Sequence, residues 1–324
     1  MGYTLLYQDN VTGVIYDIST LANDIQHYTE LDSQAGKLTF TLQKDPNKLL
    51  TKVRQGATIV LMGSLKVLFR GKIFASKMNK DGIMQITAYD ALRYLQNKDT
   101  MSCVDKTLFK FAQDIANASN IRINVGSCSS EKLENQLFQS QTYFQMLRTV
   151  FDQIFNKTGT YLFLRDNNGT IEITDPTKCM TSNYIGSGSN LTDFEYSEDI
   201  DTDTFTKIML FIKDKKTGSL KMVAPQQNLL NATLWGVLQE EKTFDENVKD
   251  EQAIQYGIQF LANKGRVRKT ISIKALNIDG LNAGNGFYFV IPELNIAQSV
   301  YITRATHYYN NDLSTMDLEV SLIV

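Results

Sequence analysis

The feature that most constrains the fold is an alternating strand that follows a tight turn. In residues 84–88 apolar and polar side chains alternate, which is the period-2 pattern of a half-buried strand. Asp81-Gly82 precedes it and supplies the left-handed backbone that tight hairpins need. Upstream, Gly56 opens an apolar run, and an extended segment follows. We predict a β-meander over residues 56–95 that ends where Asp90 caps a short helix.

The C-terminal part of the chain is also predicted to form strands, in a similar order. A glycine again leads an apolar run, at Gly286 as at Gly56. A strand with an arginine follows, at Arg304 as at Arg70. A polar turn then leads into strict alternation in residues 316–321. Because sequence identity between the two stretches is negligible, the pattern predicts a repeat of architecture, with two similar β-domains in one chain.

Helical periodicity is found in three segments, residues 105–119, 142–155 and 246–263. A hairpin around Asp166-Asn167-Asn168-Gly169 follows the second segment, so this middle region predicts a small module of its own. The predicted fold class is α+β, predominantly β, with two β-barrel domains and an inserted small α+β module. The predicted domains are residues 1–98 for the first barrel, 99–190 for the module of two helices and a hairpin, and 191–324 for the second barrel, with a helix near 246–263.

The composition argues against several classes of protein. The 324 residues suffice for two or three domains, and 33 Lys and Arg nearly balance 35 Asp and Glu, which argues against nucleic-acid or anionic membrane surfaces. No apolar run approaches the roughly 20 residues of a membrane helix. The N-terminus lacks the basic and apolar regions of a secretory signal. Cys103, Cys128 and Cys179 form no CxxC pair and are expected to be free thiols in a reducing compartment.

Two motifs suggest ligand binding but depart from their patterns. Asp199, Asp201 and Asp203 have the D-x-D-x-D spacing that begins a calcium loop, but Thr204 and Leu210 stand where that loop needs Gly and Glu. We therefore expect a solvated acidic turn. The Gly-Ser-Gly of residues 186–188 lacks the third glycine of a dinucleotide loop and is predicted to be a linker.

Candidates for catalysis are few. His27 and His307 are the only histidines, and neither lies in an HExxH motif or near a cysteine, so we expect no His-dependent triad and no zinc hydrolase. The only local carboxylates that could cleave a glycoside are Glu195 or Glu198 with Asp201. We predict no catalytic, cofactor-binding or metal-binding residue and no cofactor.

Two basic segments and the single tryptophan are candidates for an interaction surface. The basic residues are Lys213, Lys215, Lys216 and Lys221 in a hairpin, and Lys264, Arg266, Arg268 and Lys269 at the entry of a strand. We expect both segments to be solvated faces, although in a ring-shaped molecule either could line a channel for DNA. Trp235 is either an interface anchor or a core residue beside a glycine bend.

Four segments carry a resemblance to a known family. They are residues 35–40 (AGKLTF), 68–74 (LFRGKIF), 86–95 (ITAYDALRYL) and 234–239 (LWGVLQ). In this order they resemble the baseplate hub proteins of contractile phage tails and phage-tail-like bacteriocins, the late-control-D or XkdQ-like family. That family has a comparable Phe-x-Gly strand, an "ayDxxxYL" segment and an aromatic-Gly-x-x-Gln, and Gly36 replaces the basic residue of many relatives. The resemblance covers nearly the whole chain and implies that both β-barrels are of the tail-tube type.

The resemblance implies a structural protein that is not an enzyme. It implies a homotrimeric ring that adapts the six-fold tail tube to the three-fold spike. The implied partners are other copies of the chain, the tail tube protein, the central spike protein and, as further candidates, the tape measure and LysM-type baseplate proteins. No membrane and no specific nucleic-acid binding are implied. The protein would assemble in the bacterial cytoplasm and then belong to the baseplate of a virion or bacteriocin tail.

Two alternatives stay open at this point. The first is a cell-wall-degrading hydrolase of the same particle, for which Glu195 and Glu198 are the candidates. The second is a tail-tube or secretion-spike component that binds a different partner. The number of copies per particle separates a hub from a tube protein, because a tube contains many copies.

Overall fold

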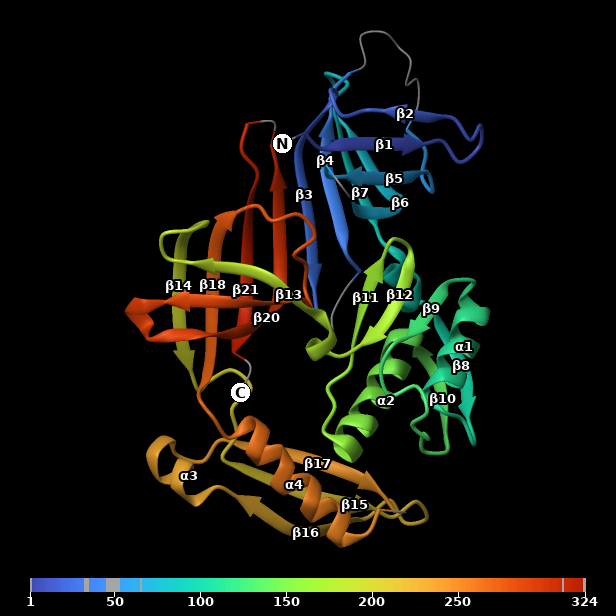
Figure 1. Ribbon diagram of the computed structural model, residues 1–324. Helices are drawn as coiled ribbons and strands as arrows, with labels where there is room; N and C mark the ends of the chain where they lie inside the picture. Colours follow the sequence, from blue (N-terminus) through green and yellow to red (C-terminus); the bar gives the residue numbers. More distant parts are fainter. Residues whose placement is uncertain are drawn as a thin grey trace. The chain divides into compact units, whose positions relative to one another are not determined.

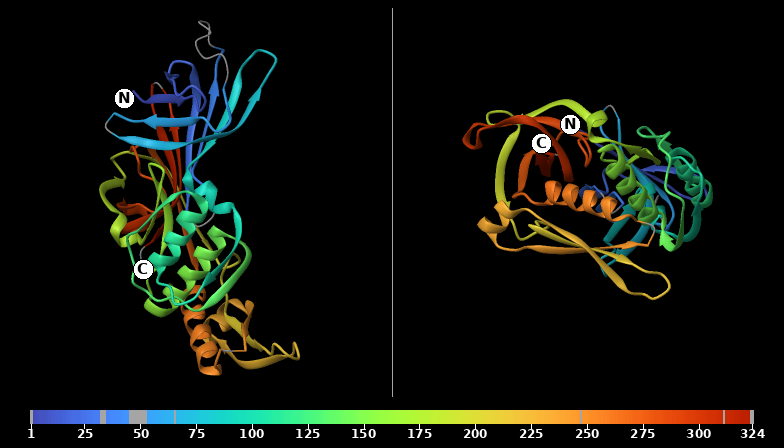
Figure 2. Two further views of the ribbon diagram at one scale, coloured as in Figure 1. Left: turned by 90° about the vertical axis from the view of Figure 1, so that its right-hand side faces the viewer. Right: turned by 90° about the horizontal axis from the view of Figure 1, so that it is seen from below.

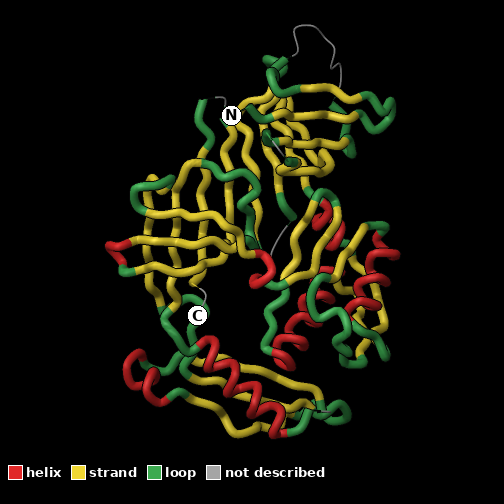
Figure 3. Tube along the Cα trace, in the orientation of Figure 1, coloured by secondary structure: helices red, strands yellow, loops and turns green. Residues whose placement is uncertain are grey.

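The computed structural model describes residues 2–31, 35–44, 53–64, 66–246, 248–310 and 312–322. The chain divides into two compact units, a larger one of Met1–Glu195 with Ile271–Val324 and a smaller one of Tyr196–Thr270. Strands predominate in the described residues (Figure 3), which confirms the predicted α+β class with a predominance of β. The domain boundaries predicted at residues 98 and 190 remain a prediction.

One sheet of 13 strands, counted over the described residues, organises the larger unit. Its N-terminal half contains β1 (Thr4–Gln8), β2 (Ile15–Asp17), β3 (Ala22–Glu30), β4 (Lys37–Leu42), β5 (Thr58–Met62), β6 (Val67–Met78) and β7 (Met84–Tyr89). Its C-terminal half contains β13 (Met180–Gly186), β14 (Leu191–Asp199), β18 (Arg268–Leu276), β19 (Gly286–Ile291), β20 (Ile296–Tyr309) and β21 (Thr315–Leu322), with the short 3-10 helix η3 (Pro292–Leu294) before β20. The order is β14-β18-β21-β20-β3-β4-β7-β6-β5-β1-β2, and β19 pairs with both β20 and β13 (Figure 1).

The two halves contain the same antiparallel meander, as predicted. It is β5-β6-β7 in the first half and β19-β20-β21 in the second. Each middle strand pairs through its first part with the preceding strand and through its last part with the following one. Each also carries a register shift, between Ile73 and Ala75 in β6 and between Ile302 and Arg304 in β20. Such bulges bend a strand and let it turn from one partner to another.

Backbone hydrogen bonds fix which residues correspond. The Gly56 N–H donates to the Ile73 carbonyl at 2.7 Å, and the Gly284 N–H donates to the Ile302 carbonyl at 2.8 Å. Both glycines have positive φ, +77° and +88°, which a side chain would strain. The counterpart of Gly56 is therefore Gly284, and the prediction of Gly286 was wrong. The two arginines do not correspond either, because Arg304 occupies the position of Ala75 relative to the bulge.

The repeat continues beyond the meander. In the first half β7 pairs with β4 and β4 pairs with β3, while in the second half β21 pairs with β18 and β18 pairs with β14. Strands β4 and β3 thus correspond to β18 and β14. The halves join where the last part of β20 pairs antiparallel with β3, with His307 opposite His27. We call this β3–β20 pairing the seam.

A small α+β module lies in the chain between the halves. Its elements are η1 (Ala91–Gln96), β8 (Lys98–Cys103), α1 (Leu108–Ser119), β9 (Arg122–Val125), β10 (Gln136–Thr142), α2 (Tyr143–Thr158), β11 (Phe163–Asn167), β12 (Thr170–Thr174) and η2 (Pro176–Cys179). The cap at Asp90 and the two helices predicted in this region are confirmed, and α2 also begins with a capping box formed by Thr142 and Gln145. Helices α1 and α2 lie side by side and share one apolar core with β11 and β12 (Figure 2). The three cysteines are free thiols, as expected.

The smaller unit is a three-stranded sheet with one helix packed on it. It comprises β15 (Lys207–Lys213), β16 (Leu220–Gln227), α3 (Leu229–Trp235), β17 (Gln239–Asp245) and α4 (Asp250–Lys264). The strand order is β16-β15-β17, and α4 packs on β15 and β16 around Ile208 and Leu210. Helix α4 confirms the helix predicted near 246–263. No helix in the described part of the chain has the length and apolar character needed to cross a membrane.

Candidate functional site

The acidic segment that resembles a calcium loop forms a turn in the smaller unit. The Asp199 carboxylate accepts hydrogen bonds from the backbone N–H groups of Asp201 at 2.9 Å and Thr202 at 2.7 Å, and these bonds lower its pKa. Asp203 forms an ion pair with Lys264. Among the described residues, no group of three or more His, Cys, Asp or Glu side chains is placed to hold a metal ion. The three aspartates therefore act as local turn and surface groups.

Of the candidate catalytic carboxylates, Glu195 and Glu198 lie on β14 and Asp201 follows this strand, and all three are exposed. Glu198 accepts a hydrogen bond from the Tyr196 hydroxyl and pairs with Lys269 at 3.3 Å, and both interactions lower its pKa. A general acid that cleaves a glycoside needs the opposite shift. The lowered pKa of Glu198 therefore does not fit the role of the general acid.

The two histidines lie far apart in sequence but meet at the seam. Their rings are stacked with centroids 6.0 Å apart, and both side chains are buried. Burial lowers the pKa of His27 to about 3 and that of His307 to about 4, so both are neutral at pH 7. The His307 ring nitrogens are held by Asn277 at 2.6 Å and by the Leu281 carbonyl at 3.1 Å. These contacts give the histidines a packing role between the two halves.

An ion-pair network crosses the seam beside the histidines. Arg304 on β20 donates to Glu30 of β3 at 2.6 Å and to Glu319 of β21 at 2.5 Å. The Tyr28 hydroxyl also donates to Glu30, at 2.6 Å. One arginine thus links three strands from both halves. Sequence analysis could not identify this network, because Glu30 and Arg304 are 274 residues apart.

A cavity of about 280 Å³ opens in the larger unit where β3, β6, η1 and the β11–β12 hairpin meet. Arg70, Asp90 and Asp166 are among its lining residues. The Asp90 carboxylate accepts from the Gly36 N–H at 2.9 Å and from the Leu92 N–H at 3.0 Å. A Cβ at Gly36 would collide with Asp90, which explains why this chain has no larger residue at that position.

Burial changes the protonation of both cavity carboxyls. It raises the pKa of Asp166 to about 6, with Arg70 partly opposing the shift. It raises the pKa of Asp90 well above its usual range, and the charge of Asp166 adds to that effect. Such groups can hold a proton near neutral pH, but Asp90 is fixed by backbone donors on both oxygens. Through these bonds Asp90 connects the start of η1 to Gly36, the residue before β4, and the sequence signalled this connection only through the cap at Asp90.

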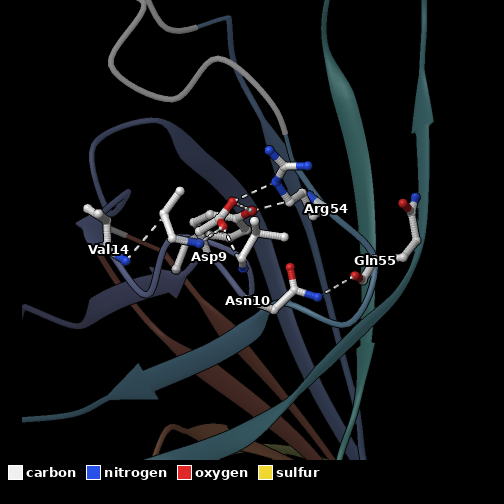
Figure 4. A network of polar contacts seen from close by, with 8 residues as sticks. Asp9, Asn10, Val14, Arg54 and Gln55 are labelled. Carbon is white, nitrogen blue, oxygen red and sulfur yellow. Dashed lines mark hydrogen bonds and ion pairs between the residues drawn. The ribbon is translucent and has the colours of Figure 1, made fainter.

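A second polar network fixes the loop between β1 and β2 (Figure 4). Asp9 accepts from the backbone N–H groups of Val11 and Thr12, both at 2.8 Å, and pairs with Arg54 at 2.9 Å. These bonds lower the pKa of Asp9 to about 2. The Asn10 side chain donates to the Gln55 carbonyl at 3.0 Å, so the loop is held against the turn that precedes β5.

The predicted interaction segments lie on the smaller unit, and four of their eight basic side chains form ion pairs with carboxylates. Lys221 pairs with Asp250 at 2.7 Å and Lys215 with Glu246 at 3.8 Å, as expected for solvated faces. Trp235 is half-buried at the end of α3. The sequence reasoning missed α3 itself, which exposes three leucines: Leu229, Leu230 and Leu234, at 73%, 72% and 67%. Apolar exposure of this kind is typical of a surface that another molecule covers.

Comparison with known proteins identifies similar chains. The model of the YQBQ-like family matches residues 25–321. The chain is 28% identical over 276 residues to the protein YqbQ of Bacillus subtilis (strain 168), which covers 83% of this chain and 82% of YqbQ. It is 26% identical over 287 residues to the phage-like element PBSX protein XkdQ of the same organism, covering 86% and 85% of the two chains.

A solved structure has the same fold. The 43 kDa tail protein of prophage MuSo2 from Shewanella oneidensis matches with a TM-score of 0.73, covers 98% of each chain and is 13% identical in sequence. At that level of identity the match defines the fold and leaves function to be argued from the surfaces of this chain.

Proposed function

Since the chain belongs to the YQBQ-like family and has the fold of a prophage tail protein, we propose that it is the structural hub of a contractile-tail baseplate. In this role three copies form a ring that adapts the six-fold tail tube to the three-fold central spike. The protein couples these parts mechanically and carries no chemistry of its own.

The internal repeat is the observation that supports this proposal most. Each chain contributes two halves with the same strand order and the same hydrogen-bond pattern around the bulged middle strand. Three chains therefore present six similar halves to a six-fold tube while keeping three-fold symmetry toward the spike. Three copies of a chain with only one such half would present three of them, which would not match a six-fold tube.

The partners follow from this position in the particle. They are two further copies of the chain, the tail tube protein on one side and the spike protein on the other, with the tape measure and LysM-type baseplate proteins as additional neighbours. Assembly takes place in the bacterial cytoplasm, and the mature location is the tail baseplate of a virion or bacteriocin. The exposed leucines of α3 provide an apolar surface for one of these contacts.

Native mass spectrometry and electron microscopy test the proposal. The protein is co-expressed with the tube and spike proteins of the same particle and purified as a complex. We expect three copies per complex and a ring in images. A chain that stays monomeric in the presence of both partners contradicts the proposal.

Zymography tests the hydrolase alternative separately. We expect no clearing of peptidoglycan by the purified protein. Clearing that disappears in Glu195→Gln or Glu198→Gln, but remains in the turn variant Asp81→Asn, would assign an enzymatic function.

A further inference from the structure

The larger unit leaves one edge of β6 open. Up to Ile73, this edge is bonded to the segment of Ala57 and β5. Beyond the bulge, residues 74–78 pair on their other side with β7, while no strand among the described residues pairs with this edge. Two apolar side chains are exposed there, Phe74 at 37% and Met78 at 67%. An open edge of this kind is a template for another strand.

The second half shows what fills the equivalent edge. Beyond its own bulge, β20 uses residues 304–309 to pair antiparallel with β3. The position of β3 in the first half corresponds to that of β14 in the second, because each pairs with the strand that flanks the last strand of the meander. Strand β14 ends the sheet and pairs only with β18 among the described residues.

From this correspondence we propose that residues 74–78 of β6 pair antiparallel with β14 of a second copy of the chain. The proposal rests on the trimeric ring proposed above and assigns the strands that close it. The contact reproduces between chains the seam that β20 and β3 form within one chain. Each copy has one β6 edge and one β14 edge, so the contact is heterologous, and three copies in a closed ring leave no edge of these two kinds unpaired.

The charges of the two edges are complementary. Lys77 and Lys80 are exposed at the end of β6 and in the following turn, while Asp193 and Glu195 are exposed on β14. Asp193 has a weak exposed contact with Lys274, at 3.6 Å with both side chains more than 60% exposed. Opposite charges on paired edges favour this pairing and disfavour β6 with β6 or β14 with β14.

The other strands that end the sheet lack this support. Within the described part of the chain, β2 pairs only with β1, and β13 pairs only with β19. Neither of them corresponds to β3 or β20, the two strands that form the seam. A second copy of the chain on β14 is therefore the occupant that the internal repeat specifies.

Disulfide trapping tests the assignment in the complex with the tube and spike proteins. A Cys128→Ser background removes the partly exposed thiol, Lys77→Cys is added on β6, and single cysteines are placed in turn at positions 193–197 of β14. After oxidation we expect covalent trimers on a non-reducing gel. They should form at every second position, because side chains alternate across a strand. The control combines Lys77→Cys with Ile15→Cys on β2, where the native side chain is 60% exposed, and should give no trimer.

The outcomes separate this inference from the hub proposal. Rings of three copies that form no cross-link at any position from 193 to 197, or that cross-link equally at position 15, overturn the strand assignment and leave the hub intact. Absence of rings overturns both.

A charge swap gives an independent readout. Lys77→Glu should raise the dissociation constant of the ring about tenfold. Addition of Glu195→Lys should return this constant to its original value. Rings that are indifferent to Lys77→Glu and are weakened by the double variant contradict the pairing.

Discussion

The two meanders of this chain have the same backbone and different side chains. Strands β6 and β20 both bend at a bulge, and both receive the same hydrogen bonds from a glycine of positive φ. Yet Gly71 in β6 corresponds to Val300 in β20, because each lies two residues before the isoleucine at the bulge. Ala75 likewise corresponds to Arg304. The edge beyond the bulge is open in the first half and carries β3 in the second.

The two halves therefore share the strand register and the bend at the bulge. Their side chains differ because each half has different neighbours. Where β20 meets β3 inside the chain, the seam is fixed by buried histidines and by the Arg304 network. Where β6 is open, the corresponding positions are small or exposed. In the second half the strand edge beyond the bulge is thus paired with β3, whereas in the first half no described strand pairs with the equivalent edge.

The largest expected effect comes from the isoleucines at the bulges. Ile73 is 1% exposed and Ile302 is fully buried. Ile73→Ala and Ile302→Ala should each lower the free energy of unfolding by about 3 kcal/mol, since each leaves a cavity in an equivalent core position. Urea unfolding followed by far-ultraviolet circular dichroism measures this, while the fluorescence of Trp235 reports on the smaller unit as an internal control. Losses that differ more than twofold would break the equivalence of the halves.

The glycine and valine of the middle strands should lose stability for opposite reasons, Gly71 when volume is added and Val300 when volume is removed. A Cβ at Gly71 would collide with the Tyr89 carbonyl and the Phe69 ring, so Gly71→Ala should cost about 2–3 kcal/mol of stability through overpacking. Val300→Ala should cost about 1–2 kcal/mol through lost burial. Both are measured by the same unfolding experiment. A Gly71→Ala variant as stable as the parent would show that the Phe-x-Gly segment is not needed for packing.

Local features of this fold were predictable from the sequence. Alternation in β7 and β21, the turn at Asp81-Gly82 and the cap at Asp90 each depend on neighbouring residues, and each was predicted. Helices α1, α2 and α4 were predicted from their apolar stripes. Helix α3 was missed because its leucines face outward, so it has no buried stripe.

Features that depend on contacts between residues far apart in the chain could not be predicted from the sequence. The counterpart of Gly56 was placed two residues too late, because only the hydrogen bond to Ile302 distinguishes Gly284 from Gly286. The meeting of His27 with His307 follows from the β3–β20 register, which local pattern cannot specify. The proximity of Asp90 and Asp166 depends in the same way on how the β11–β12 hairpin packs against η1.

The cavity carboxyls Asp90 and Asp166 allow a pH-dependent test of a feature that the second half lacks, namely a buried carboxyl at the end of the last meander strand. The counterpart of Asp90 at the end of β21 is Leu322, so the second half has no such carboxyl. Because the folded-state pKa of Asp166 is raised from 3.8 to about 6, the folded chain holds more protons than the unfolded chain between these values. The contribution of Asp166 to stability is therefore fully present below about pH 4 and is lost as pH rises toward about 6.

Asp166→Asn should remove this loss. We expect stability at pH 7 to rise by about 1–2 kcal/mol, because asparagine avoids the cost of ionising the buried carboxyl whose pKa is raised to about 6. Unfolding at pH 4, 5, 6 and 7 measures the slope, and Asp81→Asn in the exposed turn is the control. Asp9 acts in the opposite direction, because its lowered pKa of about 2 makes its contribution fall as pH decreases from about 4 to 2. A slope between pH 4 and 6 that persists in Asp166→Asn would assign it to other groups.

The smallest effect is expected at the seam arginine. Arg304→Met keeps the apolar stem but leaves Glu30 and Glu319 facing each other without a cation. Because the Arg304 side chain is 42% exposed, solvent screens the network, and we expect a loss of about 1 kcal/mol that shrinks in 1 M salt. In the first half, Ala75 pairs with Thr87 and no carboxylate lies opposite it, so Ala75→Arg should leave the stability of the single chain within about 0.5 kcal/mol. If Ala75→Arg stabilised the single chain as much as Arg304 does, the network would belong to the meander itself. The expected asymmetry instead assigns it to the β3–β20 contact, because an arginine beyond the bulge is useful only where a partner strand brings a glutamate to it.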